Sequence, residues 1–234
     1  MFSNTGSAVQ QRCLAEESLD FSSTGELVHL TNNIHAQPAI SRTKRSIDIV
    51  IALVALTFLL PLFAIVAVLI AATSPGPIIF RQHRTGLGGR PFELLKFRTM
   101  YVVENGDTIR HATRGDSRVT PIGAILRATS IDELPQLINV LRGDMSLVGP
   151  RPHAVAHDRH YGALINGYAR RFAVRPGITG LAQVRGLRGE IHQLSCMERR
   201  VNADCEYIER WSLGWDLRII LLTIPRMLGD PHAY

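Results

Sequence analysis

The fold of this chain is decided by residues 49–72, IVIALVALTFLLPLFAIVAVLIAA, a run of 24 residues without a single charge. A straight α-helix of this length is about 36 Å long, and the hydrocarbon core of a bilayer is about 30 Å thick. The run therefore predicts a membrane helix.

Two features argue against a simple span. Pro61 lies near the middle of the run, where it removes a helical hydrogen bond and clashes with the preceding turn. Basic residues, which prefer the cytoplasm, flank the run on both sides, with Arg42, Lys44 and Arg45 before it and Arg81, Arg84 and Arg90 after it. A re-entrant hairpin broken at Pro61, with halves of about 18 Å, keeps both clusters in the cytoplasm. A kinked span stays open as the alternative.

The composition is that of a globular protein with one membrane segment. The 234 residues carry a net charge of +6 and are 46% hydrophobic, which excludes a disordered, collagen-like or polytopic membrane protein. Three cysteines without a CxxC pair predict a reducing compartment. Residues 1–43 are polar, with acidic residues ahead of the apolar run, and predict a mobile tail rather than a signal peptide.

After the apolar run, the pattern becomes mixed α and β. Residues 78–84 and 90–100 flank a glycine-rich turn and predict a short β-hairpin, whose glycines do not form a dinucleotide fingerprint. Helical spacing follows in residues 122–148, 153–172, 196–211 and 213–228. The last stretch has Trp211 and Trp215 at its start and fits a core helix or an interfacial one. We expect an α+β, mostly helical, membrane-associated domain over residues 74–234.

Two adjacent carboxylates, Asp132 and Glu133, lie in the segment ATSIDELPQL. Ser130 and Glu133 have the spacing of a capping box, whereas a helix that starts at Asp132 would put Pro135 in its first turn. Both alternatives place the carboxylates at a helix N-terminus, which lowers a carboxylate pKa and attracts phosphate. A structural cap and a nucleophile or metal ligand both fit this pattern.

Arginines surround the carboxylate pair in the sequence. Arg127 precedes it, and Arg151 in GPRP and Arg175 in VRPG follow it. Proline and glycine turns would hold these guanidinium groups rigidly against phosphate oxygens. A solvated basic surface is the simpler interpretation for three others, Arg142, Arg170 and Arg171.

Three histidines, His153, His157 and His160, have the spacing of one helix face. Zinc is not expected there, because no HExxH register accompanies them. Nucleic acid is not expected either, although the pI is near 9.7, because aromatic residues are 6% of the chain and are not interleaved with the basic ones.

Five segments carry a family resemblance: KRSIDIVIALVALTFLLPLFAIVAVLI, PGPIIFRQHRTGLGGRPFELLKFRTM, TSIDELPQLINVLRGDMSLVGPRP, VRPGITGLAQVRG and WSLGWDLRIILLT. Together they resemble the bacterial sugar transferases, the small monotopic polyprenyl-phosphate phosphoglycosyl transferases, from about Lys44 to Gly229. The resemblance implies a re-entrant helix over residues 44–73, broken at Pro61, on the cytoplasmic face of the bacterial inner membrane. The family often has serine before this proline, and Leu60 stands there in this chain.

The resemblance also implies a reaction. A sugar 1-phosphate moves from a UDP-sugar to polyprenyl (undecaprenyl) phosphate, with release of UMP, as the first step of exopolysaccharide or related glycan synthesis. Asp132 is the implied nucleophile and Mg²⁺ ligand, and Glu133 completes the catalytic pair. The residues expected near phosphate or nucleotide are Lys96, Arg98, Arg127, Arg151 and Arg175.

The expected partners are therefore a UDP-sugar, polyprenyl phosphate and membrane lipids. A homo-oligomer and the identity of the sugar stay open. The alternative is a non-catalytic membrane scaffold of a polysaccharide export machinery, which would use the same anchor but would not require an Asp-Glu pair flanked by arginine motifs.

Overall fold

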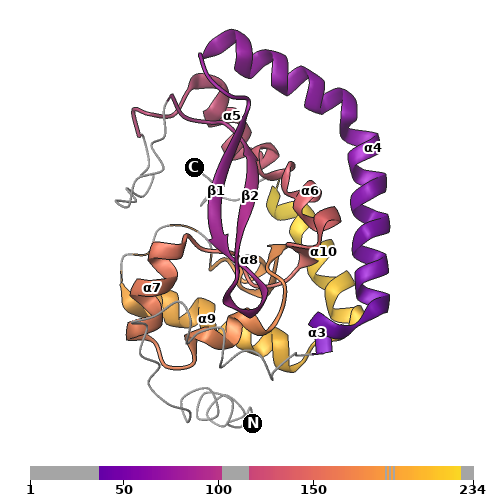
Figure 1. Ribbon diagram of the computed structural model, residues 1–234, viewed down its shortest axis with the longest axis vertical. Helices are drawn as coiled ribbons and strands as arrows, with labels where there is room; N and C mark the ends of the chain where they lie inside the picture. The colour runs from indigo at the N-terminus through magenta and orange to yellow at the C-terminus, as the bar shows by residue number, and fades with distance from the viewer. Residues whose placement is uncertain (1–36, 102–115, 188, 190, 192, 228–234) are drawn as a thin grey trace.

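The computed structural model describes residues 37–101, 116–187, 189, 191 and 193–227, and it has the expected α+β, mostly helical fold (Figure 1). Its helices are α3 (Gln37–Ile40), α4 (Arg42–Thr73), α5 (Pro121–Ala128), α6 (Gln136–Arg142), α7 (Val155–Leu164), α8 (Leu181–Val184), α9 (Leu194–Glu209) and α10 (Leu213–Met227). Its strands are β1 (Ile79–Thr85), β2 (Pro91–Phe97), β3 (Ser146–Val148) and β4 (Gly177–Thr179). Three 3-10 turns complete the list: η1 (Leu87–Gly89), η2 (Ile131–Glu133) and η3 (Tyr168–Ala173). The greater part of the expected tail, residues 1–36, lies outside the described residues.

Helix α4 contains the whole apolar run. It begins at Arg42, where the Ser41 hydroxyl accepts a hydrogen bond from the Lys44 N–H (3.2 Å). Within the described ranges it is the one helix that is long and apolar enough to cross a membrane by length and composition. The helix is not interrupted at Pro61, which corrects the expected break. It bends instead over one end of the domain (Figure 1), and we attribute the bend to the hydrogen bond that Pro61 cannot make.

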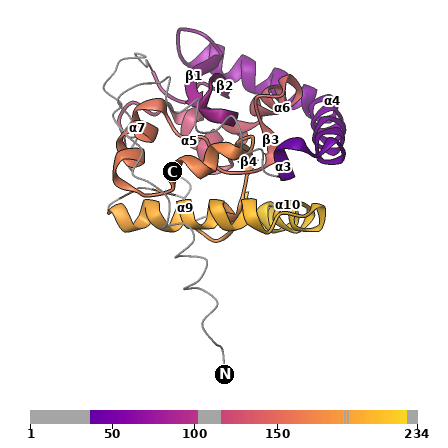
Figure 2. The same cartoon turned by 60° about the horizontal axis from the view of Figure 1, so that its bottom comes forward.

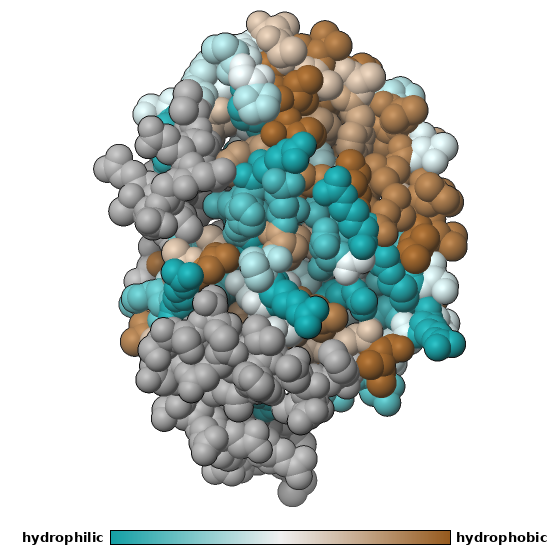
Figure 3. Space-filling model, in the orientation of Figure 1, coloured by the Kyte–Doolittle hydropathy of each residue, from teal (hydrophilic) through white to brown (hydrophobic). Residues whose placement is uncertain are grey.

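Both ends of α4 pack on the same globular body. Lys44 is buried near its start, and Ile70 near its end packs with Phe97 of β2 and Leu126 of α5. Between these contacts one face of the helix is open, and Phe58 is 82% exposed. Figure 3 shows the resulting apolar surface along the right and upper edges of the molecule, with polar side chains across the middle.

A buried polar network fixes the first turns of α4. The Lys44 Nζ donates to Asp216 Oδ2 (2.7 Å) and lies 3.9 Å from Asp48 Oδ1. Asp216, at the start of α10, also accepts hydrogen bonds from the Tyr207 hydroxyl (2.8 Å) and from Trp211 Nε1 (3.0 Å). By sequence, Lys44 is one of the basic residues that flank the apolar run. In the structure it is buried and connects α4 to α10 through Asp216.

The expected hairpin is confirmed as the antiparallel pair β1–β2, in register from Ile79 with Phe97 to Thr85 with Pro91. Helix α6 is fastened to it by the buried Asn139, whose Oδ1 accepts from the Leu95 N–H (3.0 Å) and whose Nδ2 donates to the Glu93 carbonyl (2.7 Å). This contact brings the segment just before α6 against β2.

The expected helical stretch 122–148 is divided into α5, η2, α6 and β3. Strand β3 pairs in parallel with β4, Ser146 with Gly177 and Val148 with Thr179. At the end of this strand pair the backbone of Gly149 lies close to that of Arg175. A Cβ atom on Gly149 would lie only 2.5 Å from the Arg175 carbonyl oxygen. Such a close approach requires glycine.

Helices α9 and α10 confirm the two helical stretches expected near the C-terminus. Figure 2 shows them running end to end along one side of the domain. The inner side of α10 packs on the core through Ile219, whereas its outer side exposes large apolar side chains, Leu217, Leu221, Leu222 and Ile224.

Candidate active site

Asp132 and Glu133 lie in the turn η2, not at the start of a helix as expected. Ser130 has left-handed backbone angles (φ 56°, ψ 16°), is the one non-glycine among the described residues with positive φ, and makes no side-chain cap. An N-cap residue needs extended angles instead, so the capping box does not form. Helix α6 begins only after Pro135.

Glu133 is surrounded by cations. Its Oε1 accepts from Lys96 Nζ (3.0 Å), and Arg151 binds both carboxylate oxygens, with Nη1 3.1 Å from Oε2. Glu133 in turn raises the pKa of Arg151, although burial opposes this. Two of the expected phosphate-binding residues, one from β2 and one from the loop after β3, are thus brought to the carboxylate pair.

Asp132 has a different environment. Its side chain is buried, and no donor among the described residues makes a hydrogen bond to its carboxylate. Burial raises the pKa of Asp132, and the neighbouring Glu133 adds to this, whereas Lys96, Arg127 and Arg151 lower it. The expectation that a helix N-terminus would lower this pKa is therefore wrong.

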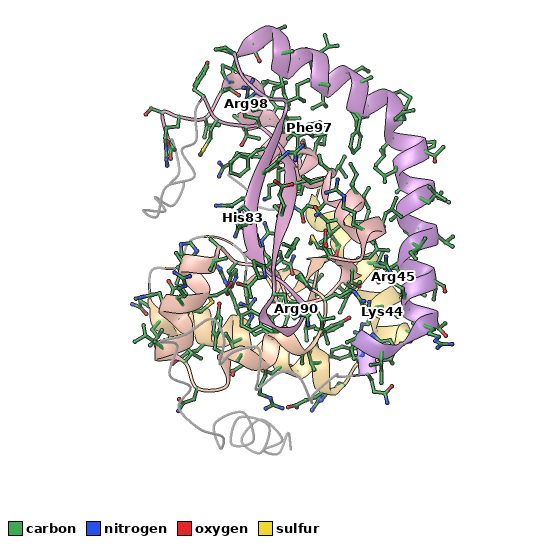
Figure 4. The ribbon with its side chains drawn as sticks, viewed as in Figure 1. Lys44, Arg45, His83, Arg90, Phe97 and Arg98 are labelled. Carbon is green, nitrogen blue, oxygen red and sulfur yellow. The ribbon has the colours of Figure 1, made fainter. Side chains whose placement is uncertain are left out.

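Arg98 and Arg175 make their contacts elsewhere. Arg98 binds the chain just after α4 through the Ser74 carbonyl (2.7 Å) and hydroxyl (2.9 Å), and Figure 4 shows it at the upper end of the hairpin. Arg175 Nε donates to the Gly143 carbonyl (2.9 Å) after α6. Neither side chain contacts the carboxylate pair in the described part of the molecule.

Arg171, expected on the solvated surface, is buried with 3% of its residue surface exposed. Its Nε donates to Asp204 Oδ2 (2.9 Å) on α9, and its Nη1 donates to the Tyr168 hydroxyl (2.8 Å). The neighbouring Arg170 is exposed and pairs with Glu209 (2.9 Å). The sequence offers no signal that separates these two adjacent arginines.

Arg84, which by sequence is one of the charges that flank the apolar run, lies beside the site. The register of the hairpin puts Arg84 and Lys96 on one face and Arg81 on the other. Arg84 Nη1 donates to the Pro152 carbonyl (3.3 Å), and burial together with Arg151 lowers the pKa of Arg84 to about 10. Strand alternation along residues 79–85 was the signal that could have found it.

The three histidines do not share one helix face. His153 precedes α7, and its Nδ1 lies 3.0 Å from the Tyr168 hydroxyl and 2.8 Å from Arg171 Nη1. Burial lowers the pKa of His153 well below its usual value. The described ranges contain no group of three or more His, Cys, Asp or Glu side chains that could hold a metal ion.

Comparison with known proteins gives the family. The bacterial sugar transferase family matches residues 39–230. The UDP-glucose:undecaprenyl-phosphate glucose-1-phosphate transferase of Caulobacter vibrioides is 55% identical over 196 residues, which are 84% of this chain and 73% of that protein. The transferase of the same name in Escherichia coli K12 is 50% identical over 191 residues, 82% of this chain and 41% of that protein. The exopolysaccharide production protein ExoY of Sinorhizobium fredii is 40% identical over 209 residues, 82% of this chain and 88% of that protein.

The chain therefore belongs to the bacterial sugar transferase family, as the sequence resemblance indicated. This assignment confirms the expected enzyme class, a phosphoglycosyl transferase.

Proposed function

We propose that this chain transfers glucose 1-phosphate from UDP-glucose to undecaprenyl phosphate and releases UMP, through a covalent intermediate on Asp132. The choice of glucose is supported by the names of relatives that are 46–55% identical, whereas a relative from Aeromonas hydrophila named for N-acetylgalactosamine is 40% identical. We propose that the product starts an exopolysaccharide, because the relatives from Rhizobium leguminosarum and Sinorhizobium fredii are named exopolysaccharide production proteins.

The observation that carries this proposal is the asymmetry of the two carboxylates. Glu133 is bound on both oxygens by Lys96 and Arg151, so it has little capacity to attack an electrophile. Asp132 receives no hydrogen bond from the described residues, and three cations act on it. A nucleophile needs free lone pairs, and an anionic substrate needs cations nearby, and the surroundings of Asp132 supply both.

In the first step an Asp132 carboxylate oxygen attacks the phosphorus that carries the sugar. The bond from this phosphorus to the bridging oxygen breaks, and UMP leaves with the electron pair. In the second step an oxygen of the lipid phosphate attacks the same phosphorus, and the Asp132 carboxylate is released. The product is a lipid diphosphate sugar. Lys96, Arg127 and Arg151 offset the charge that gathers around the phosphorus in both steps.

Glu133 serves in this proposal to orient cations. Its contacts with Lys96 and Arg151 hold both side chains beside Asp132. We prefer this role to deprotonation of the lipid phosphate, because a carboxylate that already accepts hydrogen bonds on both oxygens is a weak base.

The donor set fits Mg²⁺. Mg²⁺ is usually bound by one or two carboxylates together with substrate phosphates and water, not by an all-protein cage. The Asp132 carboxylate, which accepts no hydrogen bond from the described residues, provides one such ligand. A bound Mg²⁺ would supply charge neutralisation for the diphosphate.

The two attachments of α4 support a re-entrant membrane topology. Because both ends of α4 pack on one body, a helix that crossed the bilayer would require this body to lie on both sides. We therefore propose that α4 enters and leaves on the cytoplasmic face of the inner membrane, with the exposed apolar side of α10 at the interface. Cysteines placed before residue 44 and after residue 80 should both be protected from an impermeant reagent on intact cells. Labelling of either from outside would contradict the re-entrant arrangement.

The reaction is tested with the full chain in lipid nanodiscs and UDP-glucose alone. We expect about one equivalent of UMP per protein in a single turnover, with a hexose phosphate adduct detected by mass spectrometry. Asp132→Asn should abolish both. Asp144→Asn is the matched control after α6, because its amide oxygen can still accept the hydrogen bond from Asn139 Nδ2 (3.2 Å).

Three other outcomes are informative. UMP release that requires undecaprenyl phosphate and leaves no adduct would replace the covalent route by direct transfer. Greater turnover with UDP-N-acetylgalactosamine than with UDP-glucose would overturn the choice of sugar. Absence of UMP under every condition would favour the scaffold alternative.

A further inference from the structure

The loop that carries Arg151 is held mostly through its carbonyl groups, beside one hydrogen bond from the Gly149 N–H to the Thr179 carbonyl (2.9 Å). Its sequence, Gly-Pro-Arg-Pro from Gly149 to Pro152, contains two prolines, which have no N–H to donate. Three successive carbonyls each accept one hydrogen bond from a different element. The Pro150 carbonyl accepts from the Gly177 N–H (2.9 Å), the Arg151 carbonyl from Arg171 Nη2 (2.7 Å) and the Pro152 carbonyl from Arg84 Nη1 (3.3 Å).

Arg171 is the donor in the middle of this set, and it is itself oriented from behind. Asp204 on α9 binds its Nε (2.9 Å), and Asp158 on α7 lies 3.7 Å from its Nη1. These two buried carboxylates and Tyr168 hold the pKa of Arg171 above its usual value, although burial opposes this. The planar guanidinium thus connects two helices to one carbonyl of the loop, a geometry that lysine cannot reproduce.

A network of this kind is poorly explained by stability alone. Buried ion pairs often stabilise a fold no more than apolar side chains of the same volume. What the network does fix is the position of the Arg151 backbone, and the Arg151 side chain reaches Glu133 from there. In the described part of the structure, the Arg171 side chain makes no hydrogen bond or ion pair with Asp132 or Glu133.

We propose that Arg171, oriented by Asp204, is a positioning residue that acts through Arg151 on the carboxylate pair. The inference deepens the proposed function and rests on it for its activity measurement. Its chain of contacts runs from Asp204 to Arg171, to the Arg151 carbonyl, and through the Arg151 side chain to Glu133.

A double-mutant cycle with Arg151 tests the proposal. Arg171→Gln should slow the UMP burst about tenfold or more in the wild-type background but less than about twofold in an Arg151→Ala background, because a residue that acts through Arg151 has nothing further to lose. Arg170→Gln, the exposed neighbour, should stay within about twofold of the wild type in both backgrounds. Losses that multiply in the double variant would overturn the proposal, since a general loss of structure is independent of Arg151.

Hydrogen exchange of the full chain gives a second readout that needs no activity. Amides of the 149–154 segment should exchange about tenfold faster in Arg171→Gln than in Arg170→Gln. Equal rates would overturn the proposal. If Arg171→Gln does not fold, Asp204→Asn, which keeps an oxygen acceptor for Nε, is measured in its place with the same two expectations. A wild-type chain that releases no UMP would refute the proposed function, and the exchange comparison would still decide whether Arg171 holds the loop.

Discussion

Lys44→Met should detach the start of α4 from the domain. The buried group around Lys44 contains one cation and two carboxylates, Asp48 and Asp216. Asp48 has other partners, since it accepts from the Ser146 hydroxyl (2.7 Å) and the Leu147 N–H (3.2 Å). Asp216 keeps its hydrogen bonds from Tyr207 and Trp211 but has no other cation among the described residues, so the substitution leaves its buried charge without a counter-ion.

The expected magnitude follows from this arrangement. Removal of one partner from a buried ion pair costs about 3–5 kcal/mol. Asp216→Asn should cost less, about 1–3 kcal/mol, because Lys44 then still faces Asp48. For a chain of this size, 1 kcal/mol shifts the unfolding temperature by about 2–4 °C, so Lys44→Met should lower it by about 10 °C and Asp216→Asn by about half of that.

The assay is thermal unfolding of the full chain in detergent, followed by tryptophan fluorescence, which is suitable because Trp211 is part of the network. Arg42→Met is the matched control, since it removes a positive charge from the same turn at an exposed position. The double variant Lys44→Met/Asp216→Asn should lose less than the sum of the single variants. If Lys44→Met and Arg42→Met unfold within about 2 °C of each other, the network does not hold α4.

Two further predictions concern the site and the glycine contact. In the proposed mechanism only ionised Asp132 attacks the phosphorus, and burial raises the pKa of Asp132, so the rate of the UMP burst should fall with decreasing pH at a midpoint above the usual value of about 3.9. Lys96→Met removes a cation that lowers this pKa and should move the midpoint to higher pH; an unchanged midpoint would contradict the argument. Gly149→Ala should lower the unfolding temperature because the new Cβ meets the Arg175 carbonyl, whereas Gly214→Ala, on the open side of helix α10, should raise it slightly; equal effects would contradict the glycine argument.

Elements with local signals could be predicted from the sequence. The uncharged run indicates α4 by its length alone, the glycine-rich turn between two alternating segments indicates the hairpin, and helical spacing indicates α9 and α10. In each case the residues that determine the element are neighbours in the chain. Asp132 and Glu133 are also neighbours in the chain, so the sequence alone shows that these two carboxylates lie together.

The burial of individual charges could not be predicted, because it depends on distant partners. Lys44 pairs with Asp216, 172 residues away, and Arg171 pairs with Asp204, 33 residues away. The sequence around a buried arginine does not differ from the sequence around an exposed one. The start of α6 could not be predicted for a different reason, because the left-handed conformation of Ser130 is one that serine rarely adopts.

Helix α4 is connected at both ends to segments that lie next to the candidate site. At the start of α4, Arg45 donates to the Val140 carbonyl (2.6 Å) and the Leu141 carbonyl (3.0 Å) at the end of α6. At the other end, Arg98 binds the chain that leaves α4 (Figure 4). Helix α6 begins three residues after Glu133, and Arg98 follows β2, two residues after Lys96. The two ends of α4 are thus fastened near the segments that carry Asp132, Glu133 and Lys96. In the proposed re-entrant arrangement, a lipid phosphate held at the depth of α4 in the bilayer would meet Asp132 at a fixed height.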